Sequence, residues 1–342
     1  MDEYEPGQQI EIRPMTQQDA VGVTELVRRC YGESYLHQAI YDPAQFFAAQ
    51  QAGLQISEVA VAAGGEVIGH WAFIFHGPAV AESAMTITDE RYRGHGVASR
   101  MEAALHERLL ELGVKWMMGE PALVHTATQE IAVAHWDSGA ITGMRLKCIV
   151  HVDLKGFEQQ TETGRISLAM AFGPMAAMKE HDLWLAPPYA EIAALVLEPT
   201  DWPRTIRTEP PADLVLPEAT KLSYSFDSAM AAAKIEVEQI GSDLRAAVGA
   251  ARDQAKSAGA QFIDLRIPTD QPASATAELL ELGFSFAALL PEMRGHCDLL
   301  LLQWLADPQV ERSTWQLLNR QIERLADAVV AQAELAAELK DY

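Results

Sequence analysis

Cysteine is scarce in this chain of 342 residues, which has only Cys30, Cys148 and Cys297. Because the three are few and widely spaced, they provide neither a disulfide framework nor a zinc-binding spacing, and we predict three core thiols. The chain also lacks any apolar run near the roughly 18 residues that a membrane-spanning helix needs, and its first residues are acidic, unlike a signal peptide. These absences predict a cytoplasmic protein with no membrane partner.

Positive charge is the second shortage. The chain has 26 Lys and Arg against 48 Asp and Glu, which gives a formal net charge of −22. Such a surface repels the phosphates of nucleic acids and of anionic lipids, so neither is an expected partner. An acidic field attracts cations, which is compatible with an amine substrate, although acidic surfaces also serve solubility alone.

Apolar residues are abundant, at 49% of the chain. A length of 342 residues exceeds the usual size of one hydrophobic core, so we expect two domains.

A glycine turn followed by an amphipathic helix is the most informative segment. Arg91-Tyr-Arg-Gly94-His-Gly96 follows a predicted strand at residues 83–88 and precedes apolar positions at helical spacing, from Val97 to Leu109. Glycines allow a sharp turn and close approach of a ligand, and the unpaired amides at a helix start attract anions. The segment therefore predicts a site for a phosphate or pyrophosphate group.

Three kinds of phosphate-binding loop combine a strand, a glycine turn and a helix, and we compare the sequence with each. A P-loop would need Lys and then Ser or Thr after its last glycine, whereas Gly96 is followed by Val97 and Ala98. A dinucleotide-binding loop fits better, with Glu120 at a suitable distance to bind a ribose. However, residues 57–88 have the pattern of an antiparallel meander, and a dinucleotide fold would place the glycine turn after its first strand.

The third loop is the pyrophosphate loop of acyl-CoA enzymes, with the pattern Gln/Arg-x-x-Gly-x-Gly/Ala, which Arg91, Gly94 and Gly96 fill. With the order of strands and helices expected over residues 10–172, this stretch resembles the GNAT superfamily of N-acetyltransferases. The resemblance implies an α/β (α+β) domain at residues 9–175, with a mixed, mostly antiparallel sheet flanked by helices.

The second half, residues 176–342, resembles a degenerate copy of the same fold. Its segments at 262–267, 274–284 and 298–304 repeat a strand, a helix ending in Gly-Phe and a strand. No glycine cradle precedes them, so we expect no CoA there; an unrelated α/β module is the alternative. A long amphipathic helix expected at 313–339 either packs within the chain or forms a homodimer.

The resemblance implies direct transfer of an acetyl group from acetyl-CoA to an amine of unknown identity. The acceptor is a small-molecule or protein amine, and its site is expected at residues 28–50, among Tyr31, Glu33, Tyr35, Tyr41 and Asp42. The resemblance assigns acetyl-CoA to the strand and loop residues Thr86, Ile87, Thr88, Arg91, Arg93, Gly94, His95, Gly96, Val97 and Ala98.

Two side chains are candidates for catalysis. Glu82, at the start of the strand before the loop, is the expected general base. His135, four residues before Gly139, takes the position of a tyrosine that often protonates the leaving thiolate in this superfamily. His70 and His76 share a strand face without an evident carboxylate neighbour, so we predict no metal site. A non-catalytic acyl-CoA-binding or sensory protein is the alternative function.

Overall fold

The computed structural model describes residues 8–35, 37–150, 164–274 and 278–339. The chain forms two compact units, one containing the described residues up to Gly119 and the other containing those from Glu120 onward. Each unit has a sheet covered by helices, so the protein is of the mixed α/β class, as predicted. Among the described residues, no helix is both long and apolar enough to cross a membrane.

The sheet of the first unit is an antiparallel meander with one parallel strand at its end. Its strands run in the order β1-β2-β3-β4-β5, and only the β4–β5 pair is parallel. The strands are β1 (Ile10–Pro14), β2 (Gln55–Ala62), β3 (Val67–Phe75), β4 (Val80–Thr88) and β5 (Trp116–Gly119). This meander precedes the glycine turn, which excludes the dinucleotide-binding fold.

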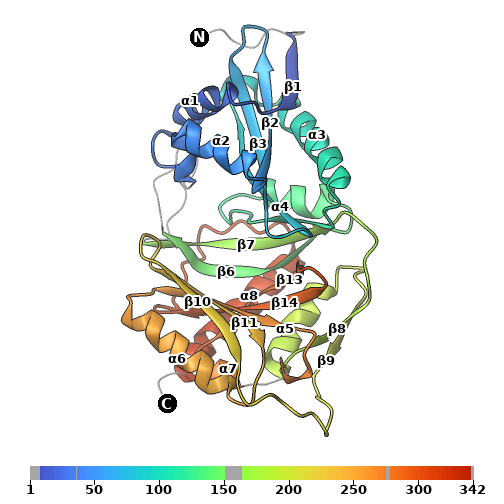
Figure 1. The fold of residues 1–342 in the computed structure, drawn as a ribbon, viewed down its shortest axis with the longest axis vertical. Coiled ribbons are helices and arrows are strands. Elements are labelled where there is room, and N and C mark those ends of the chain that lie inside the picture. Colours follow the sequence, from blue (N-terminus) through green and yellow to red (C-terminus); the bar gives the residue numbers. More distant parts are fainter. Residues whose placement is uncertain (1–7, 36, 151–163, 275–277, 340–342) are drawn as a thin grey trace. The chain divides into compact units, whose positions relative to one another are not determined.

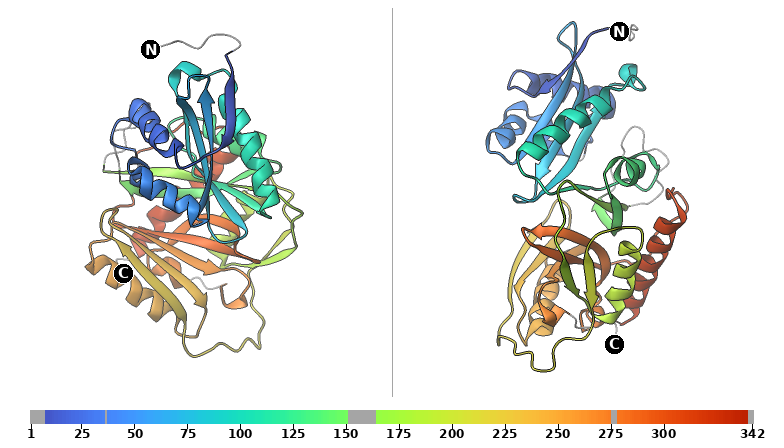
Figure 2. Two further views of the ribbon diagram at one scale, coloured as in Figure 1. Left: turned by 45° about the horizontal axis from the view of Figure 1, so that its top comes forward. Right: turned by 90° about the vertical axis from the view of Figure 1, so that its right-hand side faces the viewer.

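Helices cover both faces of this sheet (Figures 1 and 2). One face carries α1 (Asp19–Tyr31), the short η1 (Gln38–Tyr41) and α2 (Pro43–Gln51); the other carries α3 (Val97–Glu111), which follows η2 (Glu90–Tyr92). The α3 helix packs closely on β3 because Gly69 has no side chain. A Cβ there would lie 3.0 Å from Met101 and 3.2 Å from Val97. Both are apolar positions of the periodicity that predicted α3.

The sheet of the second unit is also mixed. Its strand order is β7-β6-β13-β14-β12-β11-β10, with only the β11–β12 pair parallel. The strands are β6 (Ala140–Val150), β7 (Arg165–Pro174), β10 (Lys221–Asp227), β11 (Ala232–Gln239), β12 (Phe262–Pro268), β13 (Ser285–Arg294) and β14 (Cys297–Leu305). A separate parallel pair joins β8 (His181–Trp184) to β9 (Arg204–Arg207).

Short and long helices accompany this second sheet (Figure 1). They are α4 (Ala127–Glu130), the π-helical η3 (Ile131–His135), α5 (Pro187–Leu197), α6 (Leu244–Ser257), η4 (Pro272–Ser274), α7 (Glu278–Glu281) and α8 (Arg320–Leu339). The strands predicted at 262–267 and 298–304 are β12 and β14.

The C-terminal helix begins later than predicted, at Arg320 instead of Ser313. The Asn319 side chain caps this helix by accepting a hydrogen bond from the Ile322 amide. Just before it, the side-chain amide of the buried Gln129 donates to the Gln316 carbonyl and accepts from the Leu318 amide. These tertiary contacts replace the helical bonds that the apolar spacing alone suggested.

The apolar face of α8 packs within the second unit. Gln332, the polar interruption of its heptad pattern, is buried and bridges the Phe286 amide and the Pro188 carbonyl. The homodimer through this helix stays a prediction.

The two compact units do not coincide with the two predicted domains. The division falls at Gly119, whereas the predicted boundary lies at residue 175. The reason is that β6 pairs with both β7 and β13, so its contacts fall in the second unit. The predicted boundary, which concerns family resemblance and not compactness, stays a prediction. All three cysteines are free and buried, as expected.

Candidate functional site

The parallel strands β4 and β5 pair only briefly. Their pairing begins at Val80 with Trp116 and ends at Glu82 with Met118, although β4 continues to Thr88. Beyond Glu82, the edge of β4 that faced β5 is therefore not paired with β5. The opposite edge of β4 still pairs with β3. An unpaired strand edge offers backbone donors and acceptors to an extended ligand.

A β-bulge interrupts the pairing of β4 with β3, in the part of β4 that β5 no longer pairs with. Ala84 pairs with Ala72 and Ile87 with His70, so Met85 and Thr86 together oppose a single residue, Trp71. Met85 has a φ of 52°. The His70 Nδ1 lies 2.9 Å from the Met85 carbonyl; because a carbonyl only accepts, this nitrogen carries the proton.

His70 holds the bulge through its contact with the Met85 carbonyl. Burial lowers the pKa of His70 to about 4, against the smaller opposite effect of its bond to Met85, so the ring is neutral at physiological pH. Its role is to hold the bulge from inside the core. Among the residues that the structure describes, no three His, Cys, Asp or Glu side chains gather as a metal site would require.

The glycine loop after β4 is open. Gly94 and Gly96 have φ angles of 78° and 73°, and a Cβ at either position would meet no atom within 4 Å. Gly96 caps α3 without any side-chain hydrogen bond, and the Arg100 amide donates to the Gly96 carbonyl. The amides from Val97 to Ser99 precede the first intrahelical bond, so they point out of the helix where its dipole is positive.

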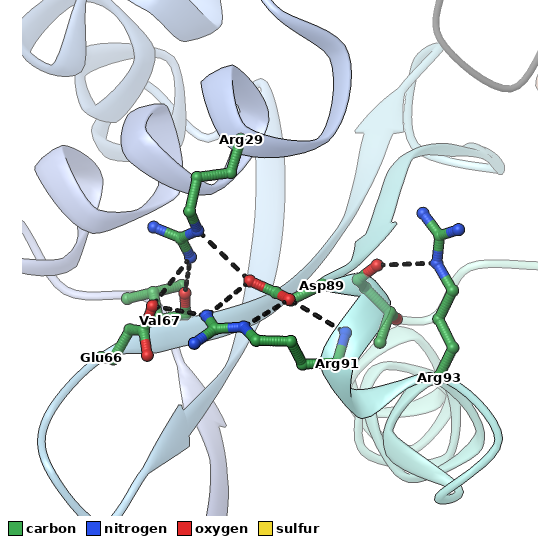
Figure 3. A network of polar contacts seen from close by, with 7 residues as sticks. Arg29, Glu66, Val67, Asp89, Arg91 and Arg93 are labelled. Atoms are coloured by element: carbon green, nitrogen blue, oxygen red, sulfur yellow. Dashed lines mark hydrogen bonds and ion pairs between the residues drawn. The ribbon is translucent and has the colours of Figure 1, made fainter. Parts of the chain in front are cut away.

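A network of charged side chains fixes the entrance to this loop (Figure 3). Asp89 accepts hydrogen bonds from the backbone and guanidinium of Arg91 and from Arg29 of α1. Glu66, in the turn between β2 and β3, binds Arg91 at 2.7 Å and Arg29 at 3.4 Å. Two cations and two anions thus tie the loop to α1 and to the neighbouring hairpin.

The charges of the network shift the pKa values of its members. Burial of Asp89 raises its pKa, but hydrogen bonds from Arg91 and Arg29 outweigh this effect and lower the pKa to about 2. Hydrogen bonds with Asp89 and Glu66 raise the pKa of Arg91. The Arg91 side chain is therefore engaged within the protein, and its predicted contact with pyrophosphate stays a prediction.

Arg93 is placed differently. It is exposed beside the loop, and its Nε donates to the Thr88 carbonyl at the end of β4. Of the predicted strand contacts, Thr86 is exposed, Thr88 is half-buried, and Ile87 points into the core beneath α1 and α2. Ile87 therefore does not offer its side chain to a ligand.

The predicted base Glu82 has a partner that sequence analysis missed. Its Oε2 lies 2.6 Å from Nε2 of His76, with 16% of the Glu82 side chain and 31% of the His76 side chain exposed. Ile74 pairs with Glu82, and the His76 amide bonds to the Val80 carbonyl, so the hairpin places His76 diagonally across from Glu82. The short turn at Gly77 could have indicated this contact from the sequence, because a short turn fixes the register of its hairpin.

Most of the candidate acceptor residues have structural roles. The Tyr41 hydroxyl donates to the Gly32 carbonyl and accepts from the Tyr35 amide, which folds the segment after α1. Glu33 forms an ion pair with Arg28. Asp42 caps α2 by accepting from two backbone amides.

A row of aromatic rings follows from the end of α1. Tyr31 stacks on Tyr35 with centroids 5.1 Å apart, and Tyr35 lies 5.8 Å from the His37 ring. Desolvation lowers the pKa of His37, while the charge of Glu82 acts in the opposite direction, so these two side chains are electrostatic neighbours.

His135 ends the π-helical turn η3 in the second unit and is exposed. Its predicted role as an acid stays a prediction.

The loop between β11 and α6 in the second unit is closed by its own chain. After β11, the amides of Ile240, Gly241 and Ser242 donate to Gln271, Thr220 and Pro217, respectively. A Cβ at Gly241 would lie 2.4 Å from the backbone of Ala219. These three backbone amides are therefore hydrogen-bonded within the protein.

Comparison with known proteins relates the first half of the chain to one family. Residues 20–126 match the model of the acetyltransferase (GNAT) family. No curated protein matches the chain.

Several solved structures resemble part of the chain. A putative acetyltransferase from Salmonella typhimurium with acetyl-CoA is 16% identical, covering 51% of this chain and 98% of its own, with a TM-score of 0.40. The ribosomal-protein-S18-alanine N-acetyltransferase from Escherichia coli is 13% identical, with coverages of 51% and 98% and a TM-score of 0.39. A GNAT-family N-acetyltransferase from Escherichia coli in complex with CoA is 20% identical, with coverages of 51% and 86% and a TM-score of 0.33.

Proposed function

We propose that this protein is an acyl-CoA-dependent N-acyltransferase that moves an acetyl group from acetyl-CoA to a small-molecule or protein amine. The observation that carries the proposal is the open glycine loop at the start of α3, which directly follows the strand β4 where it parts from β5. The segment matching the acetyltransferase family, residues 20–126, contains both features.

The residues of the first unit fit the parts of acetyl-CoA. Its pyrophosphate suits the outward amides at Gly96, Val97 and Ala98, with the exposed Arg93 adding positive charge. An extended amide-containing chain suits the unpaired edge of β4, from Thr86 to Thr88. Acetyl-CoA would supply a thioester as the acyl donor.

The reaction needs a proton acceptor and an oxyanion donor. The ammonium of the acceptor must lose a proton before its nitrogen can attack, and Glu82 stands at the last paired position of β4 and β5. A backbone amide on the unpaired β4 edge, between Thr86 and Thr88, is the proposed donor to the developing oxyanion. His135 stays the predicted acid for the leaving thiolate.

The second half of the chain is proposed to be a degenerate copy that does not bind CoA. Its pairing pattern supports this, because β10 pairs antiparallel with β11 and β11 pairs parallel with β12. The strands β3, β4 and β5 show the same sequence of pairings, and a helix follows both β4 and β11. The closed loop at Gly241 supports the loss of binding.

Isothermal titration with acetyl-CoA, desulfo-CoA and NADH tests the proposed function. Gly96→Trp would place a bulky side chain where the ligand must approach, so we expect acetyl-CoA binding to the wild type and none to this variant. Gly113→Trp is the matched control, because Gly113 also has a positive φ, of 74°, and open space around it but lies after α3. NADH binding, or acetyl-CoA binding that survives Gly96→Trp, contradicts the proposal.

A non-catalytic acyl-CoA-binding or sensory protein is the second candidate. The histidine at position 135, where the superfamily often has a tyrosine, is the feature that favours it. Assays of acetyl transfer distinguish the two, because a sensor binds acetyl-CoA without releasing CoA thiol in the presence of any amine. Glu82→Gln should lower the rate of transfer by an enzyme and leave acetyl-CoA binding unchanged in both.

A further inference from the structure

We propose that His76 is the group that takes the proton from the acceptor amine, and that Glu82 is the positioning residue that holds its imidazole ring. This inference rests on the proposed function and refines the role of Glu82 in it. His76 directly follows the last residue of β3 and Glu82 lies in β4, and the two side chains meet near the point where β4 and β5 part.

The hydrogen bond between the two residues decides which atom is the base. The Nε2 of His76 lies 2.6 Å from Oε2 of Glu82. An ionised carboxylate only accepts, so Nε2 carries the hydrogen and the lone pair of the neutral ring is on Nδ1. A carboxylate that fixes the tautomer of a histidine and stabilises the imidazolium formed on protonation is a recurring arrangement in catalysis.

The backbone holds the imidazole at this place. The His76 amide donates to the Val80 carbonyl and closes the β3–β4 hairpin, while Glu82 is paired with Ile74 on one side and Met118 on the other. Of the two side chains, His76 is more exposed, at 31% against 16%. The imidazole is therefore the member of the pair that an incoming amine reaches more readily.

The electrostatic surroundings contain one more titratable neighbour. The charge of Glu82 raises the pKa of His37, before η1, against the larger opposite effect of desolvation, while the Glu82 carboxylate itself is hydrogen-bonded to His76. His76 is bonded to this carboxylate, whereas the ring of His37 lies 5.8 Å from that of Tyr35 and belongs to the aromatic row from α1. The pair His76–Glu82 is therefore the bonded unit, and His37 is its neighbour.

The proton balance of the step is simple. The ammonium gives one proton to Nδ1 of His76, and the neutral nitrogen attacks the thioester carbonyl carbon. The C–N bond forms, the C–S bond breaks, and the second proton lost by the nitrogen ends on the CoA thiolate. One ammonium and one thioester yield one amide, one thiol and one proton, which His76 then releases to water.

Four variants test the assignment by transfer from acetyl-CoA to spermidine, L-lysine, kanamycin and a lysine-containing peptide. We expect His76→Gln to lower kcat at pH 7 by about 10²-fold to 10⁴-fold, as loss of a general base does. Glu82→Gln should cost less, because a glutamine oxygen can still accept from Nε2. His106→Gln and Glu107→Gln, at exposed positions on α3, are the matched controls that keep full activity.

Two further measurements separate catalysis from folding. Acetyl-CoA affinity by calorimetry should be unchanged in His76→Gln, and its activity deficit should shrink at high pH, where the amine is already neutral. In the ligand-free protein, ¹⁵N NMR should show a protonated Nε2 for the His76 ring, and Glu82→Gln should redistribute its tautomers. If His76→Gln fails to fold, His76→Asn replaces it.

The outcomes are distinct. Near-wild-type transfer by His76→Gln at pH 7, or a protonated Nδ1 in the wild type, overturns the role of His76 and leaves the proposed function intact. Absence of transfer to every amine by a wild-type protein that binds acetyl-CoA overturns the proposed enzyme and this assignment with it.

Discussion

At the scale of single residues, Asp89 determines how the glycine loop is held. Its carboxylate is almost fully buried, with 5% of the side chain exposed, and it binds two guanidinium groups from different segments. The sequence motif predicts that Arg91 contacts the ligand, and its bonds to Asp89 show that it also supports the loop. The exposed Arg93 is the arginine left to face solvent.

The stability of the protein should depend on Asp89 at low pH. The pKa of Asp89 is lowered from 3.8 to about 2 in the folded state. Its contribution, about 2 kcal/mol, is therefore present above pH 4 and is lost as the pH falls from about 4 to 2. Asp89→Asn should lower the free energy of unfolding at pH 7 and flatten its decline in this range, as measured by urea denaturation.

The exposed Asp253→Asn is the control for this prediction, with 61% of the Asp253 side chain exposed. An Asp89→Asn protein as stable at pH 7 as the wild type would contradict the prediction.

Substitution of Arg91 and of Arg93 should affect different properties, stability for Arg91 and acetyl-CoA binding for Arg93. Arg91→Gln leaves the buried Asp89 with one guanidinium fewer and should lower stability by about 2 kcal/mol. Arg93→Gln should leave stability unchanged but weaken acetyl-CoA binding about tenfold, because it removes an exposed charge beside the loop. Thermal unfolding and calorimetric titration of both variants check this, and equal effects of the two on binding alone would show that Arg91 also contacts the ligand.

At the scale of elements, a buried ion pair joins β9 to β14 in the second unit. Arg204 is fully buried and Asp298 is 4% exposed, and Asp298 also accepts from the Glu292 amide. The ion pair therefore attaches the small β8–β9 sheet to the large sheet of the same unit.

Breaking this pair on one side should be costly. Arg204→Met leaves the Asp298 charge buried without its partner, which costs about 3–5 kcal/mol. The double variant Arg204→Met, Asp298→Asn should recover part of this loss, because it removes the charge but keeps the acceptor for the Glu292 amide. Guanidinium denaturation of the three proteins measures the difference. A double variant no more stable than the single one would assign the loss to packing.

At the scale of the whole molecule, the protein should bind one CoA per chain. The first unit has an open glycine loop, whereas the chain itself occupies the amides of the loop at Gly241. Calorimetric titration of the wild type should give a stoichiometry near one, and Gly96→Trp should reduce it to zero. A stoichiometry near two, or one that persists in Gly96→Trp, would show that the second loop opens to ligand.

The sequence determined the local features of this protein. Gly94 and Gly96 adopt the left-handed φ angles that only glycine adopts readily, and the apolar spacing from Val97 to Leu109 made α3. The antiparallel meander predicted over residues 57–88 is formed by β2, β3 and β4. These elements were predictable because their causes, backbone freedom and side-chain periodicity, act between residues close in the chain.

Only the tertiary structure decided which distant side chains meet. The bonds of Arg91 to Glu66, of Asp89 to Arg29 and of Gln129 to Leu318 join segments far apart in sequence. The His76–Glu82 pair was hidden for a related reason, since it depends on the register of a hairpin and not on spacing alone. Ion pairs and buried hydrogen bonds depend on distances set by packing, and packing couples the whole chain at once.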